Sequence, residues 1–500
     1  MFTDARTLET GTSLEVNLCV VGAGAAGLSV VSGLVDGAHR IAVIESGAMS
    51  PNRRIDDLSK GKAFGRLLGQ RNQYLQQTRT RAFGGLGEQW HGTCRPLDAE
   101  DFAARGWVPN SGWPIDPSEL AEPYRRAGEL LGLGQVSTAA SEEWIPNDEG
   151  FRSSWLDHAP RPSIAELFST RLRKAENVEV LTRANVSAIE LDDAKQRVVA
   201  VHVDCLDGPQ LIIRARAFVL AAGVIENARL LLLSDHQRSR GLGNEHDTVG
   251  RFFMDQIQAQ AGYVALLGRD GRMSSYGSAL PRPGADHPMR AILRPTEALQ
   301  AHHELLNSQT LVSPVEVDAA GELGHDVVRL AEVSAALGTT SGSPNAEPWF
   351  GEVVLRGEQS PNRASRVRLG SETDELNLRR ARLTWQLSDH DVWSLTSTAR
   401  LLGDSLGRRR LGRMRLQAMR FWSRRHYSWT GYQSGTTRMS MAPADGVVDT
   451  DCRLHDIDNL FVAGSSVFPT SGCSGPMLTT VALALRLGDH VNGILDRESA

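Results

Sequence analysis

The chain has 500 residues, a hydrophobic fraction of 41%, a charged fraction of 23% and a formal net charge of −5. This length exceeds what one hydrophobic core usually supports, so we expect two domains. The small negative charge provides no broad basic surface, so we expect neither nucleic acid nor a membrane among the partners.

The cysteines and the first residues bear on cell compartment. The five cysteines are odd in number and lack the spacing of a disulfide framework or a zinc site, which predicts a reducing environment and no metal. Residues 1–15 are polar and contain acids, unlike a signal peptide, and no apolar run is long enough to span a bilayer. We therefore predict a soluble, cytoplasmic protein.

The N-terminal segment has the pattern of a nucleotide-binding βαβ unit. A strand over Leu14 to Val21 leads directly into the glycine-rich turn of residues 22–27. A helix from Leu28 to Val35 and a second strand from Arg40 to Glu45 complete the unit, which is typical of a dinucleotide site.

Each glycine of this turn has a physical role. Gly22 makes the tight turn, Gly24 allows backbone to approach a pyrophosphate, and Gly27 allows the helix to pack on the strand. The helix N-terminus attracts phosphate, and an acid at the end of the second strand binds an adenosine ribose with a free 2′-hydroxyl. The nucleotide contacts predicted here are Gly22, Gly24, Ala25, Ala26, Gly27, Glu45 and Ser46.

The middle of the chain changes character twice. A helix is predicted over Leu167 to Ala175. Five strands follow, over 178–182, 186–191, 198–204, 211–217 and 217–222, and Gly223 begins a helix that runs to Leu233. Residues 259–430 alternate strands with polar loops, including a loop at 338–348, and end with a helix over 389–406. We interpret them as a substrate domain built on an antiparallel sheet with flanking helices.

The segment from Asn459 to Gly488 is a second glycine-rich region, and it resembles the nucleotide domain again. The predicted fold is therefore α/β, with a discontinuous Rossmann-like domain (residues 1–258 and 431–500) around the substrate domain. Two distant glycine-rich segments that close on one ligand favour a large dinucleotide. FAD is the preferred cofactor, and NAD alone is the alternative.

Seven segments in order resemble the glucose–methanol–choline (GMC) oxidoreductase family. These segments are residues 83–98, 107–115, 218–234, 249–256, 358–369, 435–440 and the run from 459. The resemblance implies FAD in the nucleotide domain and a flavin loop at residues 81–98. The further cofactor contacts that it implies are Gly84, Gly85, Gln89, Trp90, Ala222, Gly223, Gly464, Ser465, Pro476 and Met477.

The same resemblance bears on how flavin is held. Some members attach flavin to a histidine at the position of Gln89, so non-covalent FAD is predicted here. His91, two residues later, is the alternative attachment point.

The family's proton-handling residues are replaced. The resemblance places the usual histidine base at Tyr432 and its histidine or asparagine partner at Gly475. Tyrosine is protonated at neutral pH, so it does not reproduce a neutral imidazole. Tyr432 could act as an acid, as a hydrogen-bond donor or as an activated base. The other candidate substitutes are Gln433, His426, Tyr427, Asp255 and Gln256.

These replacements lead to the functional prediction. We expect an FAD-dependent oxidoreductase that takes hydride from an alcohol, a sugar or a specialised metabolite, by a non-standard oxidation or a desaturation that needs no strong base. The alternative is a non-redox flavoenzyme that catalyses elimination, addition or cyclisation. A third hypothesis is a flavin-bound structural or regulatory protein.

Residues 408–425 contain eight arginines. The simplest interpretation is a solvated surface paired with acids elsewhere. The alternatives include a membrane-surface helix, a nucleic-acid patch, and attraction of an acidic or carrier-tethered substrate, since the stretch leads toward Tyr432.

Overall fold

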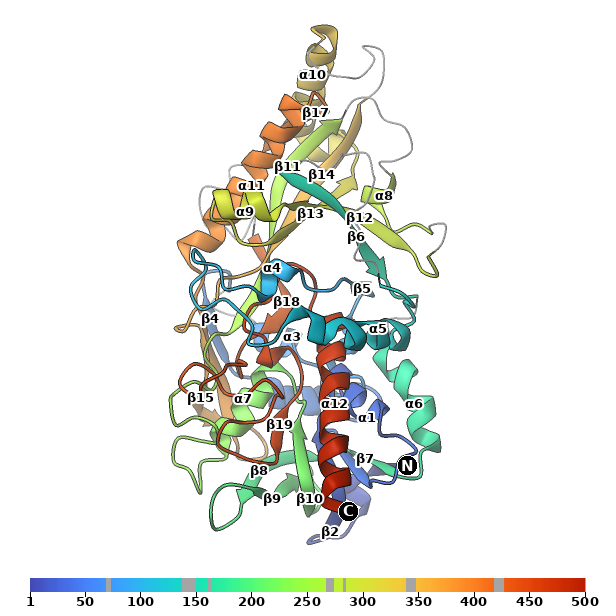
Figure 1. Cartoon of the computed structure of the whole chain (residues 1–500), viewed down its shortest axis with the longest axis vertical. Helices are drawn as coiled ribbons and strands as arrows, with labels where there is room; N and C mark the ends of the chain where they lie inside the picture. Colours follow the sequence, from blue (N-terminus) through green and yellow to red (C-terminus); the bar gives the residue numbers. More distant parts are fainter. Residues whose placement is uncertain are drawn as a thin grey trace.

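The computed structural model describes residues 1–68, 73–136, 150–160, 163–266, 274–281, 285–338, 348–417 and 427–499. Most of the loop predicted at 338–348 and the candidate His426 lie outside these residues. The molecule is elongated, with one large sheet in its lower half, a second in its upper half and both termini at the lower end (Figure 1).

The lower sheet is the nucleotide-binding sheet that the sequence predicts. Its strand order is β1-β7-β3-β2-β10-β9-β8, with β19 beside β10. All neighbours pair in parallel except β8 with β9 and β9 with β10. The strands are β1 (Phe2–Asp4), β2 (Ser13–Val21), β3 (Ile41–Ile44), β7 (Val178–Thr182), β8 (Asn185–Leu191), β9 (Val198–Asp204), β10 (Gln210–Leu220) and β19 (Leu460–Val462). Their parallel centre is buried and continuously apolar, as expected of a sheet covered on both faces.

Helices from both ends of the chain pack together on this sheet. Helix α12 (Met477–Ser499) lies along α1 (Ala25–Ser32) (Figure 1). A β-carbon at Gly488 would lie 2.6 Å from the carbonyl oxygen of Val30, so only glycine permits this approach. The chain ends are thereby joined in one layer. The other helices of this half are α5 (Ala121–Leu130), α6 (Ile164–Lys174) and α7 (Val224–Leu233).

The upper sheet is antiparallel throughout, which confirms that prediction. Its order is β17-β11-β14-β13-β12-β6-β5, and β18 also pairs with β11. The strands are β5 (Thr93–Cys94), β6 (Phe151–His158), β11 (Met254–Leu266), β12 (Met289–Pro295), β13 (Ser308–Pro314), β14 (Trp349–Gly357), β17 (Gly412–Leu416) and β18 (Tyr427–Ser434). The accompanying helices are α8 (Ser274–Gly277), α9 (Glu297–His302), α10 (Gly321–Ala336) and α11 (Asp389–Arg408).

A third, three-stranded sheet consists of β4 (Lys62–Gly65), β15 (Arg366–Thr373) and β16 (Arg379–Trp385). Three short helices belong to the connecting segments: α2 (Arg53–Asp56), α3 (Tyr74–Gln77) and α4 (Ala99–Phe102). The upper sheet takes β5, β6 and the start of β11 from before residue 259. The domain boundaries at 258 and 430 therefore stay a prediction, while the sheets themselves cross them.

Two sequence predictions about single elements were wrong. The strands expected at 211–217 and 217–222 are one strand, β10, because β2 pairs with it along almost its whole length. Helix α1 begins at Ala25, three residues earlier than expected, and ends before Gly33. The N–H of Leu28 donates to the carbonyl of Gly24 at 3.0 Å, so helical bonding starts inside the glycine motif.

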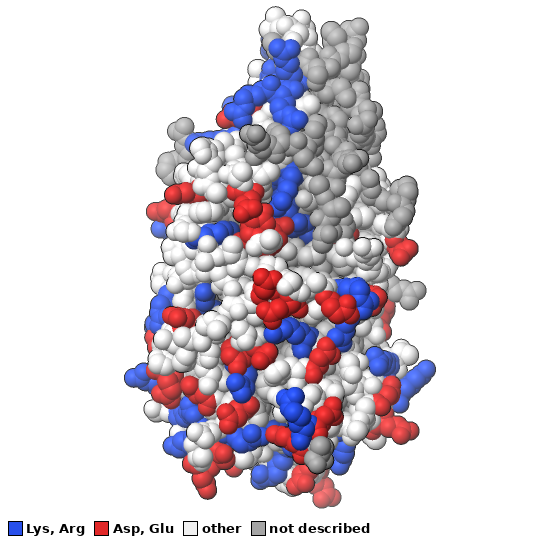
Figure 2. All heavy atoms as spheres, viewed as in Figure 1, with Lys and Arg blue, Asp and Glu red and all other residues white. Residues whose placement is uncertain are grey.

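The described residues contain no helix that is both long and apolar enough for a bilayer. They contain no group of three or more His, Cys, Asp and Glu side chains suited to a metal ion. All five cysteines are buried and free. Charges of both signs are mixed over most of the face shown in Figure 2, while basic side chains predominate at the narrow upper end.

Candidate functional site

A cavity of about 580 Å³ runs between the two large sheets. It is bounded by the N-terminal glycine turn, the segment 77–91, the start of α7, strands β14 and β18, and the C-terminal run 463–480. Both glycine-rich segments thus line one space. The cavity is within the size range of sites that hold small molecules and cofactors.

The predicted cofactor contacts converge on this cavity. All of them line it except Gly27 and Gly84, which lie behind it; those that line it are Gly22, Gly24, Ala25, Ala26, Glu45, Ser46, Gly85, Gln89, Trp90, Ala222, Gly223, Gly464, Ser465, Pro476 and Met477. Among the predicted catalytic residues, Tyr432, Gln433 and Gly475 line it as well.

The three glycines of the N-terminal turn differ in what surrounds them. Gly22 has a φ of +109°, and a β-carbon there would lie 2.5 Å from the carbonyl oxygen of Ala221. A β-carbon at Gly27 would lie 2.0 Å from the carbonyl oxygen of Gly22. Gly24 has nothing closer than 4.0 Å and borders the cavity. Gly22 and Gly27 are therefore required by the fold, whereas Gly24 leaves room for a ligand.

Glu45 follows β3, where a ribose-binding acid was predicted. Its two carboxylate oxygens accept N–H groups from Ala23, at 3.0 Å, and from Gly47, at 2.8 Å. Burial raises the pKa of Glu45, and these hydrogen bonds oppose the shift. The carboxylate thus fixes the turn after β2 and also lines the cavity beside Ser46.

A cluster of five ionised side chains lines the nucleotide end of the cavity, and the sequence did not reveal it. Glu226 on α7 pairs with Arg79, with Arg81 at 3.0 Å and with Arg229 at 3.2 Å, and Arg229 also binds Asp374 at 2.6 Å. Burial opposes ionisation of Glu226, but the three guanidinium groups hold its pKa at about 2. Three cations against two anions leave one net positive charge, which suits a pyrophosphate.

The flavin loop lies against the glycine turn. Gly24 and Gly84 form a parallel bridge, and a β-carbon at Gly85 would lie 3.1 Å from the Cα of Gly24. Gly85 has a φ of +59°, so glycine suits both the conformation and the contact. The Nε2 of Gln89 donates to the Oγ1 of Thr80 at 2.7 Å, which gives Gln89 a hydrogen-bonding role.

The opposite end of the cavity, which we call the substrate end, is formed by Gln258, Arg356, Trp429, Tyr432 and Gly475. A β-carbon at Gly475 would lie 3.3 Å from the Cε2 of Tyr432. The guanidinium of Arg356 stands 5.2 Å from the centre of the Tyr432 ring, and its Nη2 donates to the Oε1 of Gln258 at 3.2 Å. Arg356 and Gln258 were not predicted, because their placement depends on the pairing of β11 with β14.

A buried carboxylate supports the loop that carries Tyr432. Asp255 accepts hydrogen bonds from the hydroxyl of Tyr74 at 2.6 Å, the Oγ1 of Thr430 at 3.0 Å and the N–H of Gly431 at 3.1 Å. Burial raises the pKa of Asp255 to about 6, although these hydrogen bonds act against the rise. Residues 430–432 of β18 stand against the single residue Gln256 of β11, between the pairs Asp255–Gln433 and Ile257–Trp429, and this irregularity lets the loop project from β18.

Three residues considered as substitute bases are either hydrogen-bonded within the protein or placed outside the cavity. The Nε2 of Gln433 donates to Tyr74 at 3.0 Å and to Thr78 at 2.9 Å. Gln256 holds the turn before α12 by donating to the carbonyls of Gly472, at 2.8 Å, and Ser474, at 2.7 Å. Tyr427 is buried on β18 and lies outside the cavity lining.

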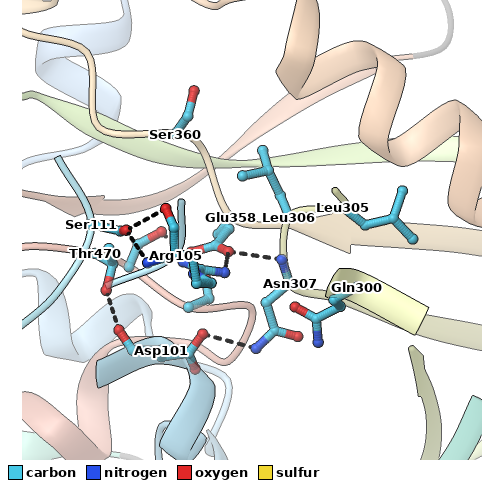
Figure 3. A network of polar contacts seen from close by, with 12 residues as sticks. Asp101, Arg105, Ser111, Gln300, Leu305, Leu306, Asn307, Glu358, Ser360 and Thr470 are labelled. Carbon is cyan, nitrogen blue, oxygen red and sulfur yellow. Dashed lines mark hydrogen bonds and ion pairs between the residues drawn. The ribbon is translucent and has the colours of Figure 1, made fainter. Parts of the chain in front are cut away.

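A second buried network joins the segment after α4 to the upper sheet (Figure 3). Arg105 pairs with Glu358, with 3.0 Å between Nη2 and Oε2. Asn307 donates to Asp101 at 2.9 Å and, through its N–H, to Glu358 at 2.7 Å. Burial raises the pKa of Asp101 to about 7, and the charges of Asp98 and Glu358 add to this shift. The network joins residues 101–105 to the start of β13 and the end of β14.

The residues present fit FAD. The open space at Gly24, the excess positive charge of the cluster around Glu226 and the glycine loop at Gly85 all border one cavity. A pyrophosphate requires the open glycine turn and positive charge, and a flat ring system requires a glycine loop that leaves room beside it.

Comparisons with known proteins agree with this fit. The family model described as "GMC oxidoreductase" matches residues 104–258 with its N-terminal part and residues 361–484 with its C-terminal part, together more than half of the chain. The chain is 25% identical over 417 residues to 2-methyl-1,2-propanediol dehydrogenase of Mycolicibacterium austroafricanum, which covers 79% of this chain and 65% of that protein.

Two other curated relatives are similar to the chain at the same level. It is 24% identical over 330 residues to the fructose dehydrogenase large subunit of Gluconobacter japonicus, covering 64% of this chain and 55% of that one. It is 25% identical over 440 residues to C-glycoside 3-oxidase of Microbacterium trichothecenolyticum, covering 82% and 74%. The matched part thus spans less than two thirds of the first two relatives.

Solved structures show the same fold. Pyridoxine 4-oxidase from Mesorbium loti superposes with a TM-score of 0.55 at 18% identity, over 95% of this chain and 99% of that one. A formate oxidase variant of Aspergillus oryzae superposes with a TM-score of 0.55 at 16% identity, over 97% and 99%. The chain belongs to the GMC oxidoreductase family, whose cofactor is FAD.

Proposed function

We propose that the protein is an FAD-dependent oxidoreductase that takes hydride from a carbon of a small organic molecule at the substrate end of the cavity. The observation that carries this proposal is the single cavity, which both glycine-rich segments line and which ends at Tyr432 and Arg356. The names of the relatives refer to a diol, a sugar and a C-glycoside, which supports an oxidisable carbon bearing oxygen.

Bound FAD supplies the two-electron acceptor. The chain contributes binding through Gly24, Gly85 and the cluster around Glu226, and it encloses the reacting carbon at the substrate end. The substrate gives up one hydride and one proton, so that C–OH becomes C=O, or CH–CH becomes C=C. The residues that remain to be assigned are those that handle the proton.

Tyr432 is the proposed proton-handling group. Its hydroxyl has no hydrogen-bond partner among the residues that the structure describes, so it is free to bond to an oxygen of the substrate. Gly475 contributes no functional group. We propose that the hydroxyl of Tyr432 donates a hydrogen bond to the substrate oxygen, that the substrate releases its proton to water, and that the reaction is a non-standard oxidation or a desaturation without a strong imidazole base.

The structure describes residues 408–417 of the arginine-rich stretch, and this part is not assigned to substrate attraction. Arg413 on β17 pairs with Ala265, whereas Gln433 beside Tyr432 pairs with Asp255 on the same strand, β11. Ten residues of extended strand separate the two positions, which corresponds to roughly 33 Å. An acidic substrate is supported instead by Arg356, inside the cavity.

Anaerobic mixing tests the proposed function. The purified flavoprotein is mixed without oxygen with a panel of diols, sugars and hydroxy acids, and the visible absorbance of oxidised flavin is followed. Bleaching by a compound supports oxidation. Formation of product while the flavin stays oxidised would instead establish the non-redox alternative, which the absence of an imidazole at both positions keeps open.

A further inference from the structure

Arg356 is the one charged side chain that β11, β14 and β18 contribute to the described cavity lining. The acids that line the cavity, Glu45, Glu226 and Asp374, belong to its nucleotide end, where Glu226 and Asp374 pair with arginines. A cation at the substrate end without an acid beside it creates a local positive potential in a space that encloses the substrate.

The hydrogen-bonding capacity of Arg356 is largely unused. A guanidinium has five N–H donors. The Nη2 of Arg356 donates to Gln258 at 3.2 Å, while its Nε is buried and has no partner among the described residues. The guanidinium carbon lies over the ring of Tyr432, 5.2 Å from its centre. Neither Gln258 nor Tyr432 is an acidic residue that could neutralise the guanidinium.

A polar side chain without hydrogen-bond partners in the described part of the chain also lies on β13, the strand next to β14. Gln309 on β13 pairs with Arg356 across the sheet, and both atoms of its buried side-chain amide lack partners. Paired residues of an antiparallel sheet project from the same face, so the two unsatisfied side chains stand next to each other. Burial and then the charge of Arg356 lower the pKa of Arg290 on β12, whose own donors bind Tyr276, Val312 and Ser313.

We propose that the substrate is a carboxylate anion and that Arg356 binds its carboxylate group. This inference rests on the proposed function and specifies its substrate class. A planar guanidinium edge matches two carboxylate oxygens, and its single charge balances a monoanion. A phosphate dianion would need a second free cation, and Arg290 is committed to protein acceptors. The carboxylate anchors the molecule so that its reacting carbon lies beside Tyr432.

Binding to the oxidised flavoprotein tests this inference without turnover. The visible spectrum of the flavin is recorded while benzoate, benzamide or phenylphosphonate is added. We expect saturable binding of benzoate that is at least about tenfold tighter than binding of the neutral, isosteric benzamide, as for a hydrogen bond to a charged group. Absence of benzoate binding, equal affinity for benzamide, or tighter binding of phenylphosphonate would overturn the carboxylate assignment.

Three variants localise the effect. Arg356→Met is expected to weaken benzoate by about tenfold or more and to leave benzamide nearly unchanged. Arg356→Lys retains the charge and is expected to fall between the two, which covers the case in which Arg356→Met does not fold. Arg415→Met removes an exposed arginine from β17 of the same sheet and should bind benzoate like the parent. Equal benzoate affinity in the parent and in the Arg356 variants would refute the proposal.

The result is separable from the proposed function. A flavoprotein that binds benzoate through Arg356 but shows no bleaching with any hydroxy acid would retain this inference while the oxidative function fails. Bleaching by neutral sugars, with no binding of benzoate, would produce the opposite outcome.

Discussion

Gly475 and the ring of Tyr432 occupy adjoining space, because a β-carbon on residue 475 would lie 3.3 Å from Cε2 of the tyrosine. The two positions at which the sequence predicts a departure from the family pattern are therefore in contact. A β-carbon at 475 would require the ring of Tyr432 to move by a few tenths of an ångström, and the same ring lies 5.2 Å from the guanidinium of Arg356. The ring of Tyr432 thus lies against both Gly475 and the guanidinium of Arg356.

This contact predicts coupling between residues 432 and 475. Gly475→Val should lower the apparent melting temperature of the flavoprotein, because the added carbons displace the Tyr432 ring. In a Tyr432→Ala background the same change should cost less, with a coupling energy of about 1 kcal/mol. Gly106→Ala, at a glycine with nothing within 4 Å, is the control. Additive effects of the two substitutions would mean that the ring and residue 475 are independent.

The hydroxyl of Tyr432 is expected to act in the reaction. Tyr432→Phe retains the ring that supports Arg356 and removes the group that binds substrate oxygen. Turnover of a bleaching substrate should fall by about 10²-fold, the lower bound for a positioned acid or base, while the Kd for benzoate stays nearly the same. If turnover of Tyr432→Phe matches the parent at every pH tested, the hydroxyl has no part in the mechanism.

The glycines of the N-terminal turn should separate folding from cofactor binding. Gly27→Ala places a carbon 2.0 Å from a carbonyl oxygen, so it should destabilise the apoprotein. Gly24→Ala meets no protein atom closer than 4.0 Å, so the melting temperature of the apoprotein should be retained while FAD content falls. Melting curves with and without FAD distinguish the two. Normal FAD binding by Gly24→Ala would remove that glycine from the site.

The raised pKa of Asp255 predicts that the stability of the folded protein depends on pH. Its pKa in the folded protein, about 6, exceeds the ordinary value of 3.8, so the folded state holds a proton that the unfolded state releases. Stability should therefore fall as the pH rises from about 4 to about 6, by at most about 3 kcal/mol at 1.36 kcal/mol per pKa unit.

Melting temperatures of Asp255→Asn between pH 4 and pH 8 test this dependence. The melting temperature of Asp255→Asn should fall less between pH 4 and pH 6 than that of the parent. The altered hydrogen bonds shift the whole curve by a constant amount and do not change this difference in slope. Asp193→Asn, at an exposed loop position, should parallel the parent. A curve for Asp255→Asn that also parallels the parent would contradict the assigned shift.

The cluster around Glu226 should be required both for stability and for FAD binding. Glu226→Gln removes the carboxylate that three arginines share, and the loss of one partner from a buried ion pair typically costs about 3–5 kcal/mol. We expect a large drop in melting temperature and loss of bound FAD. Glu372→Gln, which breaks an exposed pair with Lys62, should leave the melting temperature nearly unchanged. If Glu226→Gln and Glu372→Gln change the melting temperature and the FAD content equally, the buried cluster contributes no more than an exposed ion pair.

The sequence predicts those parts of the site whose chemistry is local. The glycine turn, Glu45 and the flavin loop are set by backbone conformation and short spacing, and the structure brings them to one cavity. The family, the antiparallel upper sheet and FAD are confirmed as well. The individual site residues stay predictions until a ligand is observed.

The residues that the sequence missed depend on long-range pairing. Arg356 reaches the cavity through the register of β14 against β11, and Arg79 meets Glu226 from 147 positions away. No local pattern marks either one. The apparent division of β10 into two strands had the same origin, since its continuity follows from pairing with β2 rather than from its own composition.

The FAD content of the purified protein tests the central claim most directly. After purification, the protein is denatured, the precipitate is removed, and FAD in the supernatant is measured against protein. The account predicts close to one FAD per chain, all of it released, since the resemblance to the family puts Gln89 rather than a histidine at the position of attachment. A protein that stays colourless after incubation with FAD would contradict the account, and flavin retained in the precipitate would contradict the non-covalent mode of binding.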